Sequence, residues 1–131
     1  MPYEVSGVTP SSRNSDKLGF VRITYDFALH GGAVGNINLP EFVLPPKAFI
    51  VGGGIHVITA PTSGGSATIT VTAGGATIKA STAIASFTGE LALATMPVFS
   101  SSGGSVTVAV GTAALTAGKF DIVLLYATAS A

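Results

Sequence analysis

Residues 21–30 carry the clearest hydrophobic pattern in the chain, a strict alternation of apolar residues with polar or small ones. A strand places successive side chains on opposite faces, so this period of two predicts a strand with one apolar face and one polar face. Gly31-Gly32 then predicts a turn into a shorter strand at residues 34–39. The apolar members of the first strand are Val21, Ile23, Tyr25, Phe27 and Leu29.

The rest of the chain continues as short β-branched segments separated by glycine and proline. Pro40, Pro45 and Pro46 are expected to bracket a loop, because proline cannot donate to a central ladder. Gly52-Gly53-Gly54 predicts a bulge, a bend or a close backbone approach inside a strand. Residues 81–88 fit one helical turn or a loop. Further strands are expected at residues 49–59, 67–73, 77–80, 90–95, 105–111 and 119–127, which brings the total to about eight.

An internal similarity bears on the topology. Residues 64–71 and 103–110 each combine a Gly-Gly turn with an alternating strand. Two similar quarters suit the double Greek key of a jelly roll, and chance repetition in a low-complexity β sequence is the alternative left open. We therefore expect an all-β fold, an eight-stranded jelly-roll-like β-sandwich formed by residues 19–131. Residues 1–18 are polar and lack a sustained period, so they are expected to form an extended N-terminal arm or an untethered tail.

Composition excludes several functions. Charged residues make up 9% of the chain and the net charge is zero, so there is no basic stripe for nucleic acid or for a membrane surface. No run of about 18 apolar residues and no basic, apolar leader is present. The chain has no cysteine, which excludes disulfides and fits assembly in a reducing cytoplasm. A neutral, sparsely charged surface favours association with partners.

The last predicted strand is apolar on both faces. Phe120, Ile122, Leu124 and Tyr126 form one face, and Val123, Leu125 and Ala127 lie on the other. Such a strand is either covered on both faces within the fold or lies at a subunit interface. We prefer the second interpretation, in which Val123, Leu125 and Ala127 pack against a symmetry-related copy.

The sequence offers no constellation for catalysis. His30 and His56 belong to no metal-binding spacing, and His56 is expected to be a core or interface residue. No GxSxG motif occurs, and Gly118-Lys119-Phe120 lacks the first glycine and the hydroxyl residue of a phosphate loop. The six carboxylates form no cluster. We expect a protein that is not an enzyme and binds no cofactor or metal.

Several segments resemble a known family. Residues 18–20 and 24–27, the turn at 31–35, residues 59–69 and residues 115–120 are similar, in that order, to decoration (cement) proteins on the heads of tailed bacteriophages, including cyanophages. The resemblance covers about residues 18–126. It implies a β-sandwich, often a jelly roll, usually trimeric, on the outer capsid surface where major capsid protein subunits meet. It carries over no catalytic residue.

The expected function is therefore a structural virion protein, assembled in the host cytoplasm, that stabilises contacts between major capsid protein subunits as a homotrimer. Within the arm, Tyr3, Val5, Val8 and Arg13 are the expected capsid-binding anchors. The alternative is a receptor- or glycan-binding β-sandwich of a phage fibre or tail. Scarce asparagine and the absence of glutamine count against that alternative.

Overall fold

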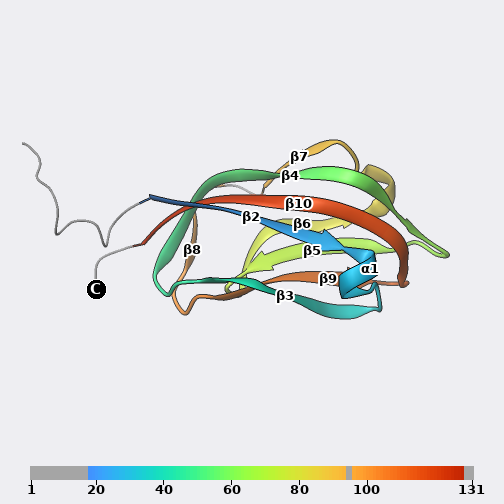
Figure 1. The fold of residues 1–131 in the computed structure, drawn as a ribbon, viewed down its shortest axis with the longest axis horizontal. Coiled ribbons are helices and arrows are strands. Elements are labelled where there is room, and N and C mark those ends of the chain that lie inside the picture. The colour runs from blue at the N-terminus through green and yellow to red at the C-terminus, as the bar shows by residue number, and fades with distance from the viewer. Residues whose placement is uncertain (1–17, 94–95, 129–131) are drawn as a thin grey trace, which may run out of the picture.

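The computed structural model describes residues 18–93 and 96–128, which form two antiparallel β-sheets facing each other (Figure 1). The all-β sandwich prediction is confirmed, whereas the jelly-roll connectivity stays a prediction. In the first sheet the order is β2-β10-β4-β7, with β8 also paired to β4, and in the second it is β3-β9-β5-β6. The strands are β2 (Leu18–Asp26), β3 (Gly35–Leu44), β4 (Ala48–Ser63), β5 (Thr68–Ala73), β6 (Ala76–Ala83), β7 (Glu90–Ala92), β8 (Val98–Ser100), β9 (Gly104–Gly111) and β10 (Leu115–Thr128).

The first strand is shorter than its alternation predicts. β2 ends at Asp26, and Phe27–His30 form one helical turn, α1. The Asp26 carboxylate accepts a hydrogen bond from the Ala28 backbone N–H, which is the N-cap contact that favours a helical turn over further strand. Leu29 is consequently 79% exposed and is not part of an apolar strand face.

The expected count of about eight strands is low, because the described residues contain nine. The missed strand is β8, whose three residues are too few to show a period. Pro40 lies inside β3 and not in a loop. It is tolerated there because β3 is an edge strand whose register shifts between Leu39 and Val43. Residues 81–88 contain the end of β6 and a 3-10 turn, η2 (Ile84–Ser86).

The core lies between the two sheets and consists of their inward-facing residues. The two similar segments noted in the sequence become β5 and β9, which are antiparallel neighbours with Ile69 opposite Val110 and Val71 opposite Val108. All four side chains are buried. Burial of each of these side chains stabilises the fold by about 1.5–3 kcal/mol relative to exposure. The repeated pattern therefore supplies core residues to the two central strands of the second sheet.

Three aromatic rings fill one part of this core. Phe120 of β10 lies between Tyr25 of β2 and Phe87, which follows η2, with ring centroids 4.9 and 4.8 Å away. None of the three residues is accessible to solvent. Aromatic pairs at this spacing stabilise a core beyond their buried area. The cluster therefore ties the segment after β6 to the centre of the first sheet.

The glycine triplet of β4 forms the predicted bulge and close approach. The β4–β10 register shifts where Leu125 faces Gly52 and Tyr126 faces Ile50. At Gly53, φ is +131° and the main chain lies against the carbonyl group of Val123. A β-carbon at this position would overlap that carbonyl oxygen. The triplet therefore lets two long strands pair closely across an irregularity.

Candidate interaction surface

The outer face of the first sheet carries an apolar patch that spans four strands. Directly opposite residues in antiparallel strands share a face. On this basis Leu125 lies beside Phe20 of β2, Ala127 beside Phe49 of β4, and Phe49 beside Phe99 of β8. Val123 precedes Leu125 by two residues and shares its face. We call these six residues the outer patch: Phe20, Phe49, Phe99, Val123, Leu125 and Ala127.

The outer patch leaves aromatic surface in contact with solvent. Phe20 is 72% exposed, and Phe49 and Phe99 are also exposed although their rings lie 4.7 Å apart. Val123, Leu125 and Ala127 are half-buried by neighbouring strands. Single exposed apolar residues are common, but a continuous group of them marks an interaction site more often than a free surface. The geometry therefore makes this face the candidate interaction surface.

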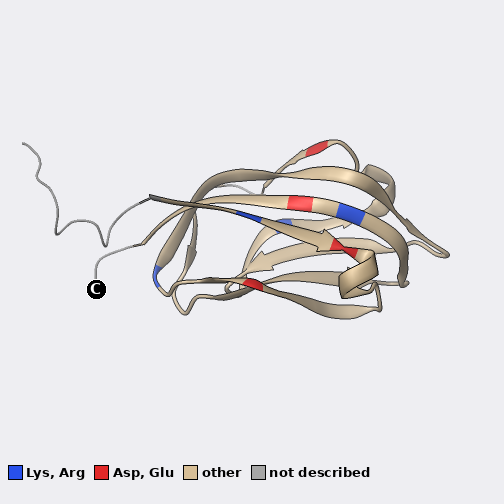
Figure 2. Cartoon of the chain, viewed as in Figure 1, with Lys and Arg blue, Asp and Glu red and all other residues tan. Residues whose placement is uncertain are grey.

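One charged side chain, Arg22, lies directly beside the outer patch, because it is opposite Val123 on the same face. Figure 2 shows the charged residues of β2 and β10 in the middle of the strands and toward α1, and Lys47 immediately precedes β4 at the end that pairs with β8. Lys119 and Asp121 lie farther along β10, toward α1. A partner that covers the outer patch therefore also covers Arg22, whose desolvation adds to the cost of binding unless an acidic group of the partner pairs with it.

The sequence-predicted sites fall into two groups. Val123, Leu125 and Ala127 lie together on the outer face of β10, and their burial by a second copy stays a prediction. Tyr3, Val5, Val8 and Arg13 lie outside the described residues.

Sequence reasoning missed Phe20, Phe49 and Phe99. Phe20 was detectable, because it is an aromatic residue in phase with Arg22 and Thr24 on the polar face. Phe49 and Phe99 become neighbours only through the pairing of β4 with β8.

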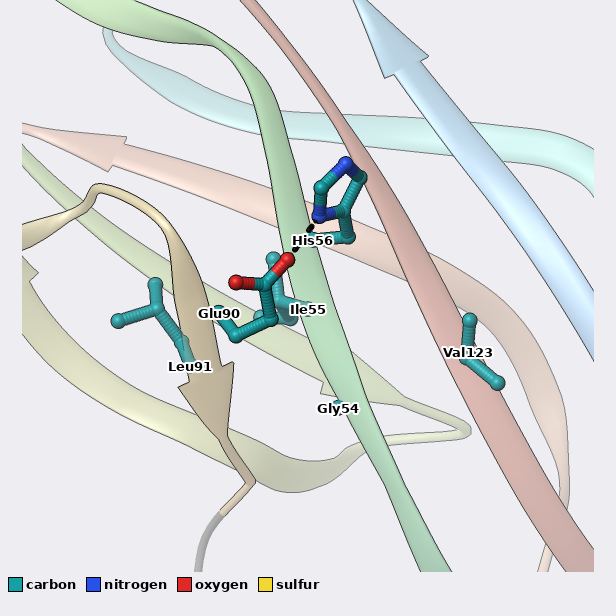
Figure 3. Close-up of a pocket in the computed structure, with 6 residues that line it drawn as sticks. All are labelled: Gly54, Ile55, His56, Glu90, Leu91 and Val123. Atoms are coloured by element: carbon teal, nitrogen blue, oxygen red, sulfur yellow. Dashed lines mark hydrogen bonds and ion pairs between the residues drawn. The ribbon is translucent and has the colours of Figure 1, made fainter.

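A shallow pocket of about 280 Å³ adjoins the outer patch at β7 (Figure 3). It is lined by Gly54, Ile55, His56, Glu90, Leu91 and Val123, and His56 Nδ1 pairs with the Glu90 carboxylate. The His56 side chain is 57% exposed, so of the two expected placements the core is wrong and the interface stays a prediction. The lining residues include no serine, threonine, cysteine or lysine. Because Val123 belongs to both, the pocket adjoins the candidate interaction surface.

A second pocket, of about 350 Å³, gathers charges near α1. His30 Nε2 lies 3.2 Å from a Glu41 oxygen, and its Nδ1 accepts a hydrogen bond from the Asp26 backbone N–H. The pKa of Glu41 lies below its ordinary value. The largest cause is a hydrogen bond from its own backbone N–H, and the next is the contact with His30. Because Glu41 belongs to β3 and His30 to α1, this contact joins the second sheet to the helical turn that follows β2. The lining residues are Arg22, Ile23, Thr24, Asp26, Leu29, His30, Glu41 and Lys119.

Alkaline conditions are expected to weaken the fold through Tyr25. The pKa of Tyr25 is raised to about 12 from the ordinary value near 10. Burial is the larger cause, and the nearby Asp26 charge is the smaller one. The unfolded chain therefore loses this proton first, and stability falls by about 1.4 kcal/mol per pH unit as pH rises from 10 toward 12. Urea denaturation at pH 8 to 12 measures the slope. Tyr25→Phe should flatten the slope. If the slope is unchanged in this variant, the pH dependence does not come from the raised pKa of Tyr25.

Within residues 18–93 and 96–128, no three histidine, cysteine or acidic side chains lie close enough to hold a metal ion. The same residues include no helix with the length and hydropathy of a membrane span.

Comparison with known proteins finds similarity at the level of fold. No protein-family model matches the chain, and no curated protein matches it in sequence. A chain in the acidic stable capsid structure of Helicobacter pylori bacteriophage KHP30 superimposes with a TM-score of 0.61 and 18% sequence identity. The match covers 86% of this chain and 89% of that chain. Both therefore share nearly the whole architecture, and at this identity the likeness concerns the fold.

Proposed function

We propose that the protein is a structural virion protein, a decoration (cement) protein of a tailed-phage head in the group that includes cyanophage proteins. The observation that carries the proposal is the fold shared along 86% of the chain with a chain of a phage capsid structure. The outer patch adds a continuous apolar surface suited to a protein partner.

The proposed mechanism is passive bridging. The protein sits on the outer capsid surface as a homotrimer and contacts neighbouring subunits of the major capsid protein, so it stabilises only the assembled shell. Three arms that bind together multiply the effective affinity by about 10² or more. The residues proposed for shell contact are Tyr3, Val5, Val8 and Arg13. In the trimer, Val123, Leu125 and Ala127 pack against a second copy.

A charge on the outer patch is expected to break the trimer. Leu125→Asp places a carboxylate between Phe20 and Gly52, where burial against another copy would desolvate it. Light scattering after size exclusion should give about three times 12.9 kDa for the wild-type protein and about 12.9 kDa for the variant. Ser81→Asp, exposed on the second sheet, is the matched control and should stay trimeric. A trimeric Leu125→Asp variant would overturn the proposed interface.

Deletion of residues 2–17 is expected to weaken shell binding about 10²-fold and leave the sandwich folded. All core residues of the described sandwich lie after residue 17, so the circular dichroism melting curve should change little. Co-sedimentation with phage shells that lack the protein measures binding. If the shortened chain binds as tightly as the full chain, the arm is not the capsid-binding element.

A further inference from the structure

Strand β2 is a long edge without a proline or a bulge, protected by the charged side chain of Arg22 and, at Asp26, by His30. Among the described residues β2 has one strand neighbour, β10, and the two align over nine consecutive pairs without a bulge. The other edges differ. β3 contains Pro40 and a register shift, the β5–β6 pairing has two shifts, and β7 and β8 have three residues each. Proteins blunt sheet edges with such devices because a long regular edge invites another strand.

The direction of the main-chain groups identifies which residues can accept that strand. The Asp26 N–H bonds to His30 Nδ1 and therefore points away from β10. In an antiparallel ladder each residue directs its N–H and C=O to the same side, and successive residues alternate. Phe20, Arg22 and Thr24 thus direct their main-chain groups to the open edge, and His30 covers that edge at Asp26.

The edge is accessible beside these residues. The 350 Å³ pocket lies along β2 and is lined by Arg22, Thr24 and Asp26, with Glu41 on the side of the second sheet. Arg22 is exposed, whereas the Thr24 hydroxyl donates to Asp121 at 2.5 Å and stays on the outer face. One carboxylate oxygen of Asp26 caps Ala28, which leaves the other for a partner.

The sequence of β2 is complementary to itself in the antiparallel register centred on Thr24. We propose that β2 pairs with β2 of a second copy, with Thr24 opposite Thr24 of that copy and Arg22 opposite its Asp26. This register puts one Arg–Asp pair on each side of a central Thr–Thr pair, and both kinds of cross-strand pair are favourable. It joins the two first sheets into one continuous sheet. In the alternative centred on Arg22, two like charges face each other.

The contact is small and therefore weak in free solution. The Thr24–Thr24 pair contributes two main-chain hydrogen bonds, at about 0.5–1.5 kcal/mol each, which do not offset the cost of association. At Asp26 the two strands meet only through the Arg22–Asp26 side chains, because His30 covers the main chain there. Copies held side by side on a surface face a much smaller cost, because their effective concentration is high. The β2 edge and the outer patch use different atoms, so one copy can make both contacts. If the proposed capsid role holds, the edge links neighbouring trimers and reinforces the shell.

Disulfide trapping tests the pairing, because the chain contains no cysteine. Cysteines at position 24 of two paired strands would stand directly opposite each other, at a spacing compatible with a disulfide. Thr24→Cys should form covalent dimers under mild oxidation at least tenfold faster than Ser81→Cys, an exposed position on the second sheet. Adding Arg22→Asp to the Thr24→Cys variant should slow dimer formation at least tenfold, because two acidic residues then face each other.

Equal cross-linking rates for the two cysteine variants would overturn the proposal, as would a rate that Arg22→Asp leaves unchanged. Circular dichroism melting curves establish that each variant is folded before its rate is compared. Shell binding of the wild-type protein is measured separately. Intact shell binding without preferential cross-linking would reject the edge contact and leave the capsid role in place. Preferential cross-linking without shell binding would reject the capsid role and leave the edge contact in place.

Discussion

Replacing Phe120 with alanine is expected to destabilise the protein by about 3–5 kcal/mol. Phe120 is fully buried and its ring contacts Tyr25 and Phe87, so the truncation opens a cavity where three elements meet. A single domain is typically stable by about 5–15 kcal/mol, so this loss removes a large share of the total. Urea denaturation monitored by circular dichroism measures it from the shift in the unfolding midpoint.

Phe20→Ala provides the matched control for this prediction. The same side chain is removed from the neighbouring strand, where it is 72% exposed, so stability should change by about 0.5 kcal/mol or less. Equal destabilisation by the two substitutions would contradict the assignment of the aromatic cluster as the core of the sandwich.

Gly53→Ala is the second substitution with a large expected effect, about 3 kcal/mol or more. The backbone conformation at φ +131° is rarely adopted by residues with a side chain, and the new β-carbon would overlap the Val123 carbonyl oxygen. Relief of this overlap requires β4 and β10 to separate, which lengthens hydrogen bonds in the middle of the first sheet. The expected result is a lower unfolding midpoint in urea and a lower melting temperature.

Gly52→Ala isolates the effect of position. This glycine is the preceding residue in β4, its φ lies outside the left-handed region, and the nearest atom to an added β-carbon is 3.9 Å away, in Leu125. Its substitution should change stability by less than about 1 kcal/mol. If Gly52→Ala is as harmful as Gly53→Ala, the loss reflects a general intolerance of β4 and not the close approach at Gly53.

Local patterns predicted the strands whose side chains alternate without interruption. β10 is the best example, because the alternation from Phe120 to Ala127 gave its two faces, although the strand begins earlier, at Leu115, and ends at Thr128. The same logic overran β2 at Phe27 and Leu29, because the Asp26 cap outweighs the alternation there. β8 was missed because its three residues owe their strand conformation to β4, far away in the sequence.

The candidate surface was predicted only where it lies on one strand. Val123, Leu125 and Ala127 stand out because they follow one another at a spacing of two. The aromatic part of the outer patch depends on the pairing of β10 with β2 and β4 and of β4 with β8. A single sequence carries no direct signal for such non-local register, so Phe49 and Phe99 could not be assigned to the surface beforehand.

The capsid role is tested most directly by co-sedimentation of the full-length protein with phage shells assembled from the major capsid protein alone. We expect saturable binding to assembled shells and none to unassembled capsid subunits, since the proposed bridging requires neighbouring subunits. Decorated shells should also withstand higher temperature than bare ones. Failure to bind intact shells, at concentrations where the protein is folded, would contradict the proposed function.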